Sequence, residues 1–115
     1  MKTKKSKLSY LMNNFFAVLS LTVSGAVMAQ SMTDLGTLGG ASSANGVSAD
    51  GSVIVGYSYI AGNSASHAFK YTGTTMSDLG TLGGAYSSAN GVSADGSVIV
   101  GYSYIADNSA YHAFK

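Results

Sequence analysis

Apolar and polar residues alternate along short runs after residue 30, and the run Ser97–Ile105 shows this pattern most clearly. In an extended strand, one face would carry Val98, Val100, Tyr102 and Tyr104, and the other Ile99, Gly101, Ser103 and Ile105. β-branched and aromatic residues, which strands prefer, dominate the run. Because both faces carry apolar bulk, we expect this strand to be covered on two sides.

A second run, Ser87–Ala94, precedes it and is separated from it by Asp95-Gly96. An Asp-Gly pair between two such runs predicts a hairpin with a type I′ turn, because that turn needs positive φ at both central residues. Asp50-Gly51 predicts the same turn earlier in the chain.

Two more strands complete the predicted unit: Ser66–Tyr71, and Thr75–Leu82, which ends before Gly83-Gly84. Tight turns join these short runs, so the pattern predicts an antiparallel up-and-down sheet of four strands. No helical periodicity competes with it after residue 30.

The chain contains a near-identical duplication, since Met32–Lys70 recurs as Met76–Lys115 with one inserted residue, Tyr86. Three of the 39 aligned pairs differ, namely Thr33/Ser77, Gly62/Asp107 and Ser66/Tyr111. A period of 44–45 residues is typical of repeat architectures, in which one unit cannot bury its apolar face alone. We therefore predict an all-β fold of tandem four-stranded antiparallel repeats, like an incomplete β-propeller. A β-solenoid is the alternative, although its coils repeat at about 20–30 residues or fewer.

Three segments follow from these patterns: a signal peptide at residues 1–29, a first repeat with its linker at 30–75, and a second repeat at 76–115. Lysines 2, 4, 5 and 7 precede an apolar stretch that begins at Phe15, and Val27-Met28-Ala29 fits a cleavage site. Polar residues interrupt the stretch, which is shorter than the roughly 20 residues of a membrane span. The second copy ends at Lys115, where the first continues into Tyr71, so we expect a truncated repeat.

Removal of the signal peptide would leave two lysines against five aspartates, a formal charge of −3. The chain contains no Arg and no basic patch, so the composition argues against nucleic-acid binding. The absence of Cys excludes disulfides and thiolate metal ligands.

Three motifs occur twice in the same order: Asp-Leu-Gly-Thr-Leu-Gly-Gly at 34–40 and 78–84, Gly-Val-Ser-Ala-Asp-Gly-Ser-Val-Ile-Val-Gly-Tyr-Ser at 46–58 and 91–103, and His-Ala-Phe-Lys at 67–70 and 112–115. With them the chain resembles the extracellular HAF-repeat family. This resemblance implies an exported bacterial protein, often the passenger of an autotransporter with an outer-membrane barrel. We expect no such translocator here, because its alternating segments have no room in the chain. The family supplies no catalytic residues to carry over.

Candidate chemistry is sparse. His67 and His112 are the only imidazoles, and one per repeat without a second ligand favours a histidine that satisfies a backbone group.

Asp50 and Asp95, far apart in the chain, are explained by turns and are too sparse for a calcium loop. Asp34 and Asp78 precede Leu-Gly, where a carboxylate accepts backbone hydrogen bonds at a turn. We predict no catalytic, metal or cofactor site.

Four tyrosines form a tyrosine-rich pattern in the two copies of one strand, at Tyr57, Tyr59, Tyr102 and Tyr104. Tyrosine suits both sheet cores and binding surfaces, because it combines a large ring with a polar tip. The sequence favours packing within or between repeats over ligand contact.

We expect an exported, non-enzymatic repeat protein, displayed on a cell surface or secreted as an adhesin-type passenger fragment. Its partners would be a host-cell or cell-surface ligand, bound by avidity, the export machinery through the signal peptide, and further copies through open sheet faces. Without a translocator we expect a periplasmic product. The alternatives are a remnant of a longer autotransporter with no independent function, and a secreted carbohydrate-binding or enzymatic propeller fragment.

The signal peptide gives a direct prediction. Exported protein should begin near Gln30, because the export peptidase would cut after Ala29. N-terminal sequencing of the exported chain measures this, and a mature protein that begins at Met1 would contradict it.

Overall fold

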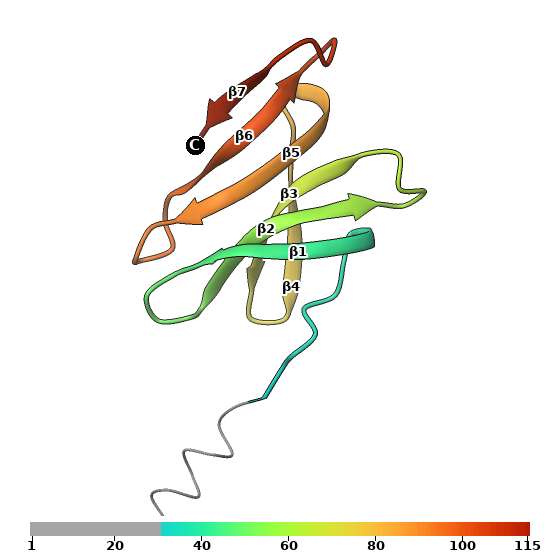
Figure 1. The fold of residues 1–115 in the computed structure, drawn as a ribbon. Coiled ribbons are helices and arrows are strands. Elements are labelled where there is room, and N and C mark those ends of the chain that lie inside the picture. The colour runs from blue at the N-terminus through green and yellow to red at the C-terminus, as the bar shows by residue number, and fades with distance from the viewer. Residues whose placement is uncertain (1–30) are drawn as a thin grey trace, which may run out of the picture. The chain divides into compact units, whose positions relative to one another are not determined.

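The computed structural model describes residues 31–115, and every regular element in that part of the chain is a β-strand (Figure 1). The all-β class predicted from the sequence is therefore confirmed. The predicted signal peptide, residues 1–29, lies outside the described residues. Residues Leu35–Lys115 form one compact unit. Among the described residues there is no helix of the length and hydropathy that a membrane crossing requires.

Four consecutive strands form the first module, each antiparallel to the next: β1 (Gly39–Val47), β2 (Val53–Ile60), β3 (Ser66–Thr72) and β4 (Thr75–Gly80). The second module repeats the order with β5 (Gly83–Val92), β6 (Ile99–Ile105) and β7 (Tyr111–Phe114). The register is the same in both modules, because Ala44 faces Gly56 as Ala89 faces Gly101, with an irregularity directly after each pair. Consecutive strands within each module are antiparallel, but the second module has three strands where four were predicted.

The two modules join where β3 and β5 run parallel for a single bridge, between Ser66 and Tyr86. This bridge makes the sheet mixed, which the sequence did not predict. The strand order β1-β2-β3-β5-β6-β7 leaves the sheet open, and β4 pairs with β3 beside this path. β5 also packs across β1 and β2, so it covers one face of the first module.

The core lies at this crossing, between β2–β3 and β5–β6. Val55, Ala68 and Ala89 are each 0% exposed, and Val53 completes the buried cluster. Partly buried apolar side chains of the second module surround it, namely Val92, Ile99 and Phe114. Gly96 belongs to the same contact, because a Cβ there would lie 2.6 Å from Val53 Cγ2. Side chains of the second module thus cover the apolar side chains on one face of the first module.

Residues of identical sequence differ sharply in burial between the modules. Val53 and Val55 are 7% and 0% exposed, whereas their counterparts Val98 and Val100 are 45% and 47% exposed. The prediction that this strand is covered on two sides is right for β2 and wrong for β6. The physical reason is the neighbour, since β5 covers β2 while the corresponding face of β6 is open to solvent.

The prediction of type I′ turns at Asp50-Gly51 and Asp95-Gly96 is wrong. β1 ends at Val47 and β2 begins at Val53, so five residues connect them. Gly51 has φ +78°, but Asp50 is not among the residues with positive φ. The Gly51 N–H donates to the Ser48 carbonyl oxygen at 3.0 Å, which closes a four-residue turn before the glycine reverses the chain. Gly96 repeats this conformation in the second module, with φ +79°.

The burial difference predicts unequal effects of one substitution at matched positions. In dilute solution, Val55→Ala should lower the free energy of unfolding by about 2–3 kcal/mol, because it removes buried methyl groups and leaves a cavity. Val100→Ala, at a half-exposed site, should cost less than about 1 kcal/mol. Denaturant titration measures both, and equal losses would contradict the packing of β5 on β2.

Candidate functional site

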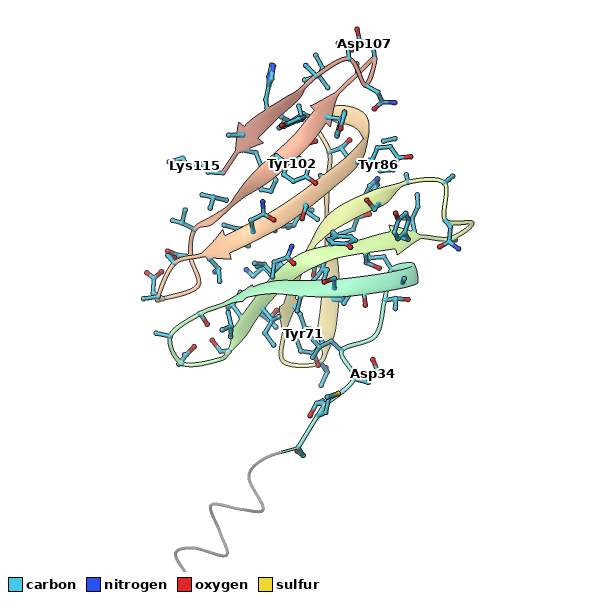
Figure 2. All side chains as sticks on the ribbon, viewed as in Figure 1. Asp34, Tyr71, Tyr86, Tyr102, Asp107 and Lys115 are labelled. Atoms are coloured by element: carbon cyan, nitrogen blue, oxygen red, sulfur yellow. The ribbon has the colours of Figure 1, made fainter. Side chains whose placement is uncertain are left out.

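A groove lined by tyrosine and serine lies beside the junction of the modules. Its volume is about 320 Å³, and its walls are Tyr57, Tyr59, Ser66, Tyr86, Ser87, Ser88, Tyr102 and Tyr104. Figure 2 labels Tyr86 and Tyr102, which lie on the second module. The groove unites all four tyrosines selected from the sequence. Sequence reasoning missed Tyr86, although its status as the one inserted residue was a signal.

The tyrosine rings meet at angles typical of aromatic pairs. Tyr86 and Tyr104 have ring centroids 5.9 Å apart at 73°, and Tyr57 and Tyr59 are 6.3 Å apart at 77°. Tyr111 adds contacts to Tyr104 at 5.5 Å and to Tyr102 at 5.3 Å. Edge-to-face and tilted contacts of this kind stabilise beyond simple area burial, so the rings hold one another in place.

The same rings remain partly accessible, with Tyr86 and Tyr102 exposed by 40% and 37%. The lining combines aromatic surface with hydroxyl groups, and no charged side chain belongs to it. Such a wall can stack on a flat or ring-shaped ligand and hydrogen-bond to its polar rim. The volume is at the low end of the range for small-molecule sites, about 300–1,000 Å³.

His67 has a partner that the sequence analysis did not predict. Its Nδ1 lies 2.8 Å from Oδ2 and 3.0 Å from Oδ1 of Asp78, so a ring N–H there donates to the carboxylate. The expectation of a backbone partner was wrong for this nitrogen. The pairing of β3 with β4, which places Asp78 opposite Phe69, brings the two side chains together. His67 and Asp78 are separated by 11 positions and belong to different sequence motifs, so the pairing of β3 with β4 is what brings them together.

Asp78 also accepts a hydrogen bond from the Gly80 N–H at 2.7 Å, which confirms the turn role predicted for it. The side chains of His67 and Asp78 are 21% and 43% exposed. A pair this accessible contributes about 0–1 kcal/mol to stability and mainly fixes the β3–β4 hairpin.

Asp34 is exposed and precedes the compact unit, and His112 is exposed on β7. Residues 31–115 hold no group of three or more potential metal ligands of the His, Cys, Asp and Glu types.

Asp50 and Asp95 organise equivalent loops. The Asp95 carboxylate accepts hydrogen bonds from the Ser97 N–H at 3.0 Å, the Ser97 hydroxyl at 2.7 Å and the Ser93 hydroxyl at 2.8 Å. Asp50 has the same partners in Ser52 and Ser48. The backbone hydrogen bond from Ser97, followed by the two hydroxyls, lowers the pKa of Asp95 to about 2. The pKa of Asp50 is lowered for the same reasons.

Although these loops are far apart in the chain, they lie side by side. The Ala49 N–H donates to the Ala94 carbonyl oxygen at 3.0 Å, next to the two aspartates. In each carboxylate, Oδ1 accepts hydrogen bonds from serine donors of its own loop. The loops therefore serve the junction of the modules, in line with the turn role predicted from the sequence.

The chain matches no protein-family model, and comparisons with curated proteins and with solved structures found no similar protein.

The lowered pKa of Asp95 predicts a pH dependence of stability. A carboxyl whose pKa is lower in the folded state stabilises the fold fully above its unfolded value of 3.8, and this contribution is lost as the pH falls towards 2. Asp95→Asn should therefore flatten the decline in the free energy of unfolding between these pH values. Ser97→Ala, which keeps the carboxyl but removes one donor, should give an intermediate slope. Denaturant titrations across the range measure this, and an unchanged slope in Asp95→Asn would contradict it.

Proposed function

We propose that this chain is an exported, non-enzymatic interaction protein of the HAF-repeat type, secreted or displayed at a cell surface as an adhesin-type passenger. The observation that carries the proposal is the tyrosine groove, an accessible aromatic and hydroxyl-lined surface without a charged lining residue. Recognition of a ligand needs apolar contact surface and a few polar groups, and this lining supplies both. The signal-like segment at residues 1–29 is the ground for export.

The finer architecture belongs to this proposal. We interpret the modules as successive blade-like units of an incomplete propeller-like array, each stacked face to face on the next. The common register of β1–β2 and β5–β6 supports this interpretation, as does the packing of β5 on the first module. In such an array every junction would offer a similar tyrosine-lined groove, and linked weak contacts would add up to avidity.

A carbohydrate-binding role is the second candidate, and the lining of the groove favours it. Aromatic rings pack against the apolar faces of flat ligands, and the hydroxyls of Ser66, Ser87 and Ser88 lie beside them. Sugars present both kinds of surface. This role differs from protein adhesion only in the ligand, so one experiment addresses both.

The proposal predicts binding by the chain when it is displayed in many copies on beads and applied to arrays of glycans and extracellular matrix proteins. Tyr86→Ser should weaken that binding by about threefold to tenfold, because one stacking ring is worth about 0.5–1.5 kcal/mol. Tyr71→Ser is the matched control, since Tyr71 lies on β3 outside the groove lining (Figure 2).

Circular dichroism of both variants checks that the fold is retained. Absence of binding to every array member in the multivalent format would overturn the interaction role. Equal losses in the Tyr71→Ser and Tyr86→Ser variants would exclude the groove as the binding surface.

A further inference from the structure

The junction inside the chain joins two different faces of the repeated module. We call one the valine face, made of Val53, Val55 and Ala68 in the first module and Val98, Val100 and Ala113 in the second. We call the other the alanine face, made of Ala44, Val47 and Ile54 in the first module and Ala89, Val92 and Ile99 in the second. The valine face of the first module packs on the alanine face of the second. Each module carries both faces, because the sequences match.

Within residues 31–115, one face of each kind is therefore left open. On the valine face of the second module, Val98 and Val100 are 45% and 47% exposed. On the alanine face of the first module, Val47 is 58% exposed and Ala44 is also exposed. Ala89, the counterpart of Ala44 inside the junction, is 0% exposed.

We propose that the valine face of the second module binds the alanine face of the first module in a second copy of this chain. The internal junction supplies the template for this contact, since the same residues already pack against each other there. The partner of the open valine face is therefore the alanine face of another copy, and the internal junction shows which residues would meet.

Polar groups at the internal junction fix the register of the proposed contact. Asn45 Nδ2 donates to the Ala89 carbonyl oxygen at 3.0 Å and lies 3.2 Å from Ser88 Oγ. Asn90 occupies the position of Asn45 in the second module and is exposed. It would make the corresponding contacts to Ala44 and Ser43 of the second copy.

A serine hydroxyl provides a second polar contact. The Ala68 N–H donates to Ser87 Oγ at 2.7 Å, while that hydroxyl donates to the Gly80 carbonyl oxygen at 2.6 Å. The equivalent Ser42 hydroxyl already donates to the Gly36 carbonyl oxygen at 3.0 Å. Its oxygen is thus oriented as the acceptor for the Ala113 N–H of another copy.

Two of the sequence differences between the modules lie at this junction, the Ser66/Tyr111 exchange and the inserted Tyr86. Ser66 and the inserted Tyr86 are bridge partners at the internal junction, a small residue opposite a large one. At the open end, Tyr111 replaces Ser66 and is 62% exposed, while the alanine-face side lacks the insertion between Ala41 and Ser42. Each junction would therefore contain one added tyrosine, supplied from opposite sides. The contact joins unlike faces, so it can extend into a filament or close into a ring.

The experiment measures the mass of the purified chain by analytical ultracentrifugation over a wide concentration range. The wild-type mass should rise to at least twice the monomer mass. Val100→Asp and Val47→Asp, which place a charge on one open face each, should both remain monomeric, and Thr74→Asp in the exposed β3–β4 turn should behave like the wild type. A mixture of Val100→Asp with Val47→Asp should form a dimer and stop there, because each variant retains one intact face.

A second pair of variants does not place a charge on either face. The chain has no cysteine, so Ala94→Cys and Ala49→Cys, in exposed loops that adjoin at the internal junction, can report proximity between copies. Oxidation of their mixture should yield the mixed disulfide dimer in excess of either homodimer. A wild-type chain that stays monomeric at every concentration would overturn the proposal. So would association blocked by only one of the charged variants, or cross-linking without preference for the mixed pair.

Discussion

Coverage of the valine face by the next module is the interaction on which the rest of the structure depends. Val55 and Ala68 are fully buried only because β5 crosses them, whereas Val100, of identical local sequence, is half exposed. Apolar burial is the main favourable term in folding, and a single module of this size has no second layer of its own to provide it. Stability therefore resides in the contact between modules at least as much as in the strands themselves.

The local pattern predicted the elements well and the contacts between them poorly. Ser66–Tyr71 was recognised as a strand, because alternation and β-branched content are local properties. The turn at Asp50 was misjudged, since serine donors on both sides of the aspartate favour a longer loop over a two-residue one. The His67–Asp78 pair and the groove around Tyr86 depend on which strands become neighbours, and strand pairing is not encoded in any short window of sequence.

Serine hydroxyls accept hydrogen bonds from several backbone N–H groups in this fold. Ser58 and Ser103 are 0% and 1% exposed, and their hydroxyls accept the N–H groups of Leu38 and Leu82 at 2.8 and 2.7 Å. Each hydroxyl also donates to the carbonyl oxygen of the following tyrosine. These bonds attach the segment that precedes β1 to β2, and the segment that precedes β5 to β6. Hydrogen-bonded buried hydroxyls therefore add to the stability of a core that contains few apolar side chains.

The shared register of the modules has a consequence for folding. β1 can pair with β6 through the same side chains that it uses with β2, because the partner sequences are nearly identical. Side-chain complementarity cannot select the native pairing. The five-residue loop between β1 and β2 does so, since closing a short loop costs less entropy than closing one of some fifty residues. Kinetic competition from the wrong hairpin partner is thus built into the duplication, and loop length is what suppresses it.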